Sequence, residues 1–125
     1  MEYRIWRPEG APRAVVQVLH GMAEHIDRYE RMARALNEQG YLVCGRNHRG
    51  HGPDAETLGY FADQNGWQVI LEDAHDVSVD IRKQYPGVPF ILLGHSMGSF
   101  LAREYAVQYG KELNGLVLSG TGFYP

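Results

Sequence analysis

One serine in this chain stands in a spacing that suits nucleophilic catalysis. Gly94, Ser96 and Gly98 form the pattern G-x-S-x-G, which directly follows an apolar run at residues 90–93. A serine on a sharp strand-to-helix turn has a strained backbone, and glycine two residues to either side removes side chains that would collide there. The pattern therefore predicts that Ser96 is exposed on a nucleophile elbow. The alternative is a glycine-rich turn in which Ser96 only caps the following helix.

Two backbone N–H groups could stabilise the oxyanion of an acyl-transfer intermediate at Ser96. The first is that of Met97, at the positive N-terminus of the predicted helix. A second donor must come from another loop, and residues 20–25 directly follow an earlier apolar run. In that loop Gly21 lets the backbone turn toward the site, and the N–H of Met22 is the candidate donor. The sequence thus predicts an oxyanion hole built from two β–α loops.

The elements that must position these residues alternate along the chain. Continuous apolar runs, of the kind found in strands buried on both faces, predict strands at residues 14–19, 41–45, 90–93 and 113–119, after a shorter strand at 3–6. Helices are predicted between the runs, at residues 28–39, 67–84 and 97–108. Strands joined by helical crossovers are parallel, and their carboxyl ends gather the ligand-binding loops. We expect one domain, residues 1–125, of the α/β class with a mostly parallel sheet and helices on both faces.

Each predicted helix has an apolar face. These faces comprise Tyr29, Met32, Ala33 and Leu36 in the first helix, Ile70, Ala74, Val77 and Ile81 in the second, and Leu101, Ala102 and Tyr105 in the third. Asp27 is placed to cap the first helix, and Gly40 follows its end. In the second helix His75 lies among Asp73, Asp76 and Asp80, which we interpret as a solvated polar face.

Three segments together resemble a known family. They are residues 19–25 (LHGMAEH) with Arg28 and Tyr29, residues 47–52 (NHRGHG) and residues 94–98 (GHSMG). The set is similar to the monoacylglycerol lipase and lysophospholipase branch of the α/β-hydrolases, also called serine aminopeptidase-like hydrolases. The resemblance implies that Ser96 is the nucleophile and that Met22 and Met97 are the oxyanion donors. It also implies that Gly21, His25 and His95 contact a lipid-like or small ester substrate. Peptidases and thioesterases share the same elbow.

Two departures from the family pattern bear on function. Asn47 stands where the family has an aspartate that organises its loop. The triad partners of this fold follow the serine in the order acid, then histidine, yet residues 97–125 contain neither His nor Asp. We therefore expect the chain to be the N-terminal part of a hydrolase, lacking the lid and the C-terminal strands. The Asp and His would come from a missing C-terminal half or a second chain.

A non-catalytic alternative stays open. A sheet that ends at residues 113–119 would expose a strand edge and apolar helix faces, and such an edge favours pairing with another chain. The sequence thus predicts a homo-oligomer or an aggregate for the isolated chain, which would then be an inactive, self-associating module.

Composition excludes several other functions. The formal net charge of −3 and the pI of about 6.0 provide no basic surface for nucleic acid. No apolar run approaches the roughly 18 residues of a transmembrane segment, so we expect a cytoplasmic protein. The single cysteine, Cys44, is expected to be a buried, inert thiol. We expect no cofactor and no metal, and interpret His48, His51 and Asp54 as parts of a hydrogen-bonded loop.

Overall fold

The computed structural model of this chain describes residues 2–21, 25–47 and 64–120. The described strands are β1 (Arg4–Trp6), β2 (Ala14–Leu19), β3 (Tyr41–Gly45), β4 (Phe90–His95) and β5 (Gly115–Ser119). The α-helices are α1 (Glu30–Glu38), α2 (Gln64–Gln84) and α3 (Met97–Tyr109). Two short 3-10 helices, η1 (Ile26–Tyr29) and η2 (Gly110–Glu112), precede α1 and follow α3.

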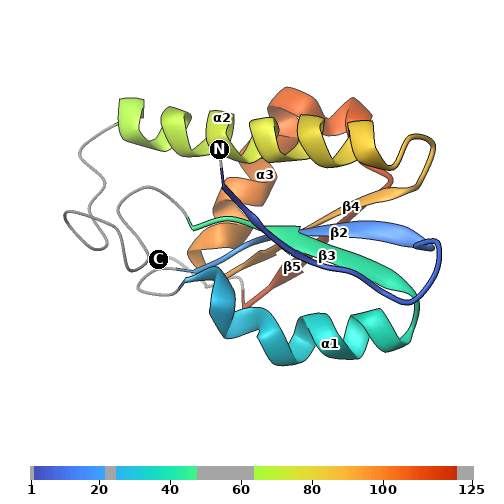
Figure 1. The fold of residues 1–125 in the computed structure, drawn as a ribbon. Helices are drawn as coiled ribbons and strands as arrows, with labels where there is room; N and C mark the ends of the chain where they lie inside the picture. Colours follow the sequence, from blue (N-terminus) through green and yellow to red (C-terminus); the bar gives the residue numbers. More distant parts are fainter. Residues whose placement is uncertain (1, 22–24, 48–63, 121–125) are drawn as a thin grey trace.

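The strands form one sheet in the order β1-β3-β2-β4-β5. Strands β3, β2, β4 and β5 are parallel to one another, and β1 pairs antiparallel with β3. Helix α1 covers one face of the sheet, and α2 and α3 cover the other (Figure 1). The predicted α/β class, with a mostly parallel sheet between helices, is confirmed.

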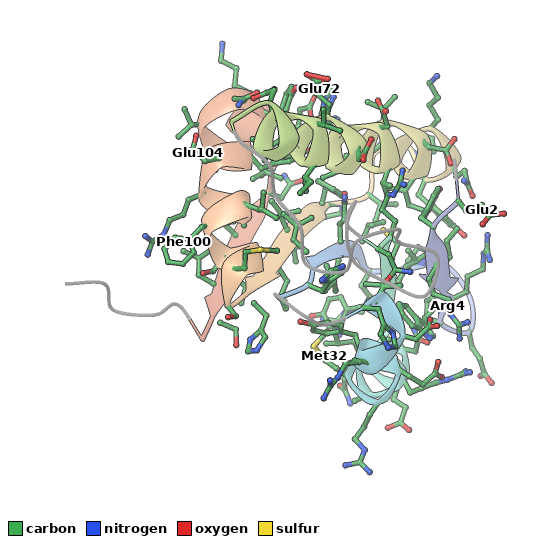
Figure 2. All side chains as sticks on the ribbon, turned by 90° about the vertical axis from the view of Figure 1, so that its left-hand side faces the viewer. Glu2, Arg4, Met32, Glu72, Phe100 and Glu104 are labelled. Atoms are coloured by element: carbon green, nitrogen blue, oxygen red, sulfur yellow. The ribbon has the colours of Figure 1, made fainter. Side chains whose placement is uncertain are left out.

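The predicted apolar faces lie against the sheet. On the α1 side, Ala33 is fully buried, and Tyr29, Met32 and Leu36 pack against the core cluster there. On the other side, every predicted apolar position of α2 and α3 is buried: Ile70, Ala74, Val77, Ile81, Leu101, Ala102 and Tyr105. Figure 2 shows the charged side chains of Glu72 and Glu104 projecting from α2 and α3.

A buried polar network joins β2, α2 and α3 on the second face. The Tyr105 hydroxyl donates to Ser78 Oγ at 2.7 Å, and Ser78 donates to Gln17 Oε1 at 2.5 Å. The amide of Gln17 in turn donates to the Ala74 carbonyl at 2.9 Å. Since an unpaired polar group in this dry layer would be costly, the network fixes how the two helices seat on the sheet.

The N-terminus of the first helix differs from the prediction. Residues 26–29 form the 3-10 helix η1, and α1 begins only at Glu30. Tyr29 is its N-cap residue and makes no side-chain cap hydrogen bond, so the prediction that Asp27 caps this helix is wrong. A different interaction orders this turn, because the Ile26 N–H donates to Asn47 Oδ1 at 2.8 Å. The amide oxygen of Asn47 thus holds the first residue of η1, at the position where the family has a carboxylate.

The polar side of α2 was predicted to be solvated, but several of its side chains are buried or have partners in other elements. Asp73 is buried at 8% exposure, and Asp80 accepts a hydrogen bond from the Tyr3 hydroxyl. The His75 ring stacks on Tyr109, with ring centroids 3.8 Å apart, and its Nε2 lies 3.1 Å from Glu112 Oε2. These partners come from the residue before β1, from α3 and from η2, so the spacing within one helix could not reveal them.

One edge of the sheet is lightly covered. Within the described residues, β5 pairs with β4 on one side only. Leu116 and Val117 are 40% and 46% exposed, whereas β2 is buried along its whole length. This strand of the described sheet therefore has two large apolar side chains that are partly exposed. Among the described helices, none has the length and apolar composition needed to cross a membrane.

Candidate active site at the turn between β4 and α3

The backbone at Ser96 is strained, as the elbow requires. Ser96 has φ 56° and ψ −119°, and it is the one non-glycine residue with a positive φ in the described part of the chain. A side chain in this region costs about 1–3 kcal/mol, so the surrounding contacts must hold it there. Ser96 is exposed and occupies the N-cap position of α3, but its side chain makes no cap hydrogen bond. The capping role considered as the alternative is therefore absent.

The two glycines of the motif are required by close approach of backbone to backbone. A Cβ on Gly98 would overlap the Leu19 carbonyl oxygen and lie 2.7 Å from the His20 carbonyl oxygen. A Cβ on Gly94 would overlap the carbonyl group of Gly98. The first turn of α3 is thus pressed onto the end of β2, where the predicted oxyanion loop begins. Glycine spacing in the sequence therefore reports a real steric need.

Two further serines hold the elbow, and sequence reasoning missed both. The Ser96 N–H donates to the carbonyl oxygen of Ser119 at 2.9 Å, which extends the β4–β5 ladder into the turn. The Ser96 carbonyl accepts from the Ser99 N–H at 2.9 Å and from Ser99 Oγ at 2.6 Å. Ser99 could have been suspected from its place in the first helical turn. Ser119 carries no motif, and only strand register brings it here.

His95 turns to the neighbouring strand. Its Nδ1 lies 3.3 Å from Ser119 Oγ, and its ring packs edge-on against Tyr29 of η1 with centroids 6.5 Å apart. No described contact joins the His95 ring to the Ser96 hydroxyl. The expectation that His95 contacts substrate stays a prediction.

The predicted oxyanion loop is described only in part. His20 is fully buried, with Nδ1 2.8 Å from the Gly21 carbonyl oxygen, and Gly21 is buried beside it. His25 is half-buried at the start of η1, and its Nδ1 has no hydrogen-bond partner among the described residues. Met22, the second predicted donor, lies outside the described residues. Met97, the first, is buried at the start of α3.

Elsewhere among the described residues, polar side chains do not form a site suited to an acyl ester or a metal. A hollow of about 560 Å³ lies beside β1, lined by charged residues such as Arg4, Arg46, Asp27 and Asp80 rather than by an apolar wall. No elbow residue lines it. Within the described residues, no group of three His, Cys, Asp or Glu side chains could hold a metal ion. The residues His48, His51 and Asp54 lie outside the described part.

Burial also makes the cysteine unreactive. Cys44 is fully buried in β3, and burial raises the pKa of its thiol well above the ordinary value of 9.0. A thiol held in its neutral form is a poor nucleophile and metal ligand. The expectation of a buried thiol is confirmed, and the chemistry-bearing residues of the described structure remain those around Ser96.

Comparison with known proteins adds independent evidence. The family model described as serine aminopeptidase, S33, matches residues 10–125. The chain is 36% identical to a monoacylglycerol lipase of Mycolicibacterium smegmatis over 118 residues, covering 94% of this chain and 41% of the relative. It is 37% identical to monoglyceride lipase of Homo sapiens over 115 residues, covering 92% and 37%.

A solved structure agrees with these sequence relatives. A thermostable carboxyl esterase from Bacillus coagulans, 40% identical, superposes with a TM-score of 0.85 over 93% of this chain and 38% of that one. The chain thus spans about two fifths of the length of each of these relatives. The fold, the elbow geometry and the family match over 116 residues agree with the resemblance read from the three motifs. The chain belongs to the serine aminopeptidase S33 family of α/β-hydrolases.

Proposed function

We propose that this chain carries the nucleophile of a serine hydrolase that cleaves carboxylic esters of lipid-like acyl groups, such as monoacylglycerols or lysophospholipids. The observation that carries the proposal is the strained, exposed Ser96 held between Gly94 and Gly98. Strain of this kind persists only where surrounding contacts enforce it, and it is concentrated at functional sites. Lipases and an esterase among the relatives support an ester rather than an amide substrate.

The mechanism follows from the position of Ser96. Its hydroxyl would attack the ester carbonyl, and the N–H groups of Met97 and Met22 would stabilise the oxyanion that forms. The alcohol would leave with a proton, and water would then release the acid from the acyl-enzyme. Both proton transfers need a histidine base oriented by a carboxylate, which residues 97–125 do not supply in family order. We propose that these groups come from a segment outside the 125 residues or from a second chain.

A chimera tests this directly. Residues 1–125 would be fused to the part of the Bacillus coagulans esterase that follows its matched segment, and turnover of a 1-monoacylglycerol would be measured. The expected result is turnover, with stoichiometric fluorophosphonate labelling that Ser96→Ala abolishes. The isolated chain, lacking a base, should label at least 100-fold more slowly, by the general acid–base contribution. A folded chimera without turnover would refute the proposal.

The exposed edge supports a second candidate, a self-associating module without catalysis. Strand β5 has no charged residue to block pairing, and Leu116 and Val117 lie on opposite faces of it, both exposed. Sedimentation velocity should show a dimer or larger species for the isolated chain, and Val117→Lys should shift it toward monomer. Val107→Lys is the control, because Val107 is 79% exposed and belongs to α3 and not to the edge strand. A monomer at high concentration would exclude this candidate.

A further inference from the structure

We infer that Ser119 is a positioning residue for the nucleophile, an inference that rests on the proposed role of Ser96. One residue of β5 makes two links to two consecutive residues of the elbow. Its carbonyl oxygen accepts the Ser96 N–H at 2.9 Å, and its Oγ lies 3.3 Å from Nδ1 of His95. Ser119 would act through these contacts and not on the substrate itself.

The need for such a residue comes from where the elbow leaves the sheet. His95 and Ser119 are the last register pair of β4 and β5, so the Ser96 N–H is the first donor beyond the regular ladder. With φ at 56°, Ser96 has turned out of the strand direction. If the Ser96 N–H lost its acceptor, fewer contacts would hold the backbone of Ser96 in its strained conformation.

The acceptor belongs to a strand that is poorly held. Strand β5 is an edge strand of the described sheet, and Ser119 is its last residue. Chain ends of edge strands fray unless side chains tie them down. The Oγ of Ser119 provides that tie, because it bonds to the ring of a residue on the neighbouring, better-covered strand β4.

Gly120 makes this arrangement tight. It has φ 60°, and a Cβ there would lie 2.9 Å from Cε1 of the His95 ring and 3.2 Å from Nδ1. The chain therefore turns closely over the ring immediately after Ser119. Tyr29 of η1 also packs against the ring. The half-buried His95 ring is thus in contact with η1 on one side and the end of β5 on another, with its Nδ1 near Ser119.

Amide hydrogen exchange of the 125-residue chain, measured by NMR, tests the inference without relying on activity. In Ser119→Ala, which keeps the carbonyl but removes Oγ, the Ser96 amide should exchange about fivefold faster, the equivalent of one lost hydrogen bond. Ser119→Thr, which keeps a hydroxyl, should restore slow exchange. Val117→Ala is the matched control on the same strand and should leave the Ser96 amide unchanged.

The His95 ring provides a second readout. Its Nδ1 resonance should report a hydrogen bond in the unsubstituted chain and shift in Ser119→Ala but not in Val117→Ala. Unchanged Ser96 exchange in Ser119→Ala would overturn the inference, even if the His95 ring resonance shifted. Fluorophosphonate labelling of the chimera reports on the proposed function alone, so a failure there is separate from a failure of Ser119 to position the elbow.

Discussion

The elbow and strand β5 are neighbours in the sheet but differ in how completely they are packed. At the elbow, glycines allow backbone to touch backbone, and the N–H and C=O of Ser96 both have partners. In β5, two large apolar residues are about half exposed, and one edge has no strand beside it among the described residues. The last two residues of β5, Leu118 and Ser119, pair with Gly94 and His95 of the elbow. The comparison shows that, among the described residues, the contacts that hold Ser96 in its strained conformation are complete, whereas the neighbouring strand β5 is only partly covered.

Glycine substitutions should reveal the largest difference between the two regions. We expect Gly98→Ala to destabilise the chain by about 4 kcal/mol or more, because the new Cβ would overlap backbone carbonyls that cannot move independently. In β5, a Cβ on Gly115 would meet Ile91 Cγ1 at 3.4 Å, an ordinary contact. Gly115→Ala should therefore change the free energy of unfolding by less than about 1 kcal/mol. Urea denaturation of both variants makes the test, and equal losses would break the comparison.

Two leucines sharpen the comparison with side-chain chemistry held constant. Leu101 in α3 is fully buried in the core below the elbow, whereas Leu116 in β5 is 40% exposed. We expect Leu101→Ala to lower the free energy of unfolding by about 3 kcal/mol, since buried methyl and methylene groups are removed and a cavity remains. Leu116→Ala should cost less than about 1 kcal/mol. A large loss at Leu116, seen in thermal or urea unfolding, would mean that β5 is covered in solution, for instance by a second copy.

The strain at Ser96 should be measurable as a gain in stability. Ser96→Gly removes the penalty of a positive φ and should raise the free energy of unfolding by about 1 kcal/mol. Ser96→Ala keeps a Cβ and should leave stability near that of the unsubstituted chain. Both variants remove the hydroxyl, so neither chimera should be labelled by a fluorophosphonate. If glycine gave no gain over alanine, the backbone at Ser96 would not be strained in solution.

The smallest expected effect concerns alkaline pH and the buried thiol in β3. Burial raises the folded-state pKa of Cys44 above its ordinary value of 9.0. Above that ordinary pKa the unfolded chain loses a proton that the folded chain keeps, so stability is full below about pH 8 and falls as pH rises. Between pH 8 and 9.5 we expect a loss of up to about 1 kcal/mol, and Cys44→Ala should reduce this slope. Equal slopes with and without the thiol would show that Cys44 ionises in the folded state.

Part of the fold and of the site could be predicted because local patterns determine them. Continuous apolar runs marked the buried strands, and helical spacing marked the faces of α1, α2 and α3. The spacing of Gly94, Ser96 and Gly98 predicted the elbow, since only glycine permits so close an approach. The predicted start of α1 was wrong. Asp27 has a side chain suited to capping, but the chain at Ile26 is held by Asn47, twenty-one residues further along.

Other features depended on contacts between distant elements. His75 and Asp73 have the spacing of a polar helix face. His75, however, contacts residues of α3 and η2, and Asp73 is buried by the packing around α2. Gln17, Ser78 and Tyr105 form a network although nothing in their own segments marks them as partners. Such pairings follow from topology and not from periodicity, so single-segment reasoning could not identify them.

The α/β alternation, the apolar faces and the serine on its glycine-flanked turn follow from residues close in the chain. That Ser119, at the end of a distant strand, accepts the Ser96 N–H and contacts His95 follows from the packed fold alone. Strand register explains the difference. The parallel pairing of β4 and β5 aligns residues 24 positions apart in the chain. At the end of this pairing, the carbonyl and hydroxyl groups of Ser119 therefore lie beside the strained serine and its neighbour His95.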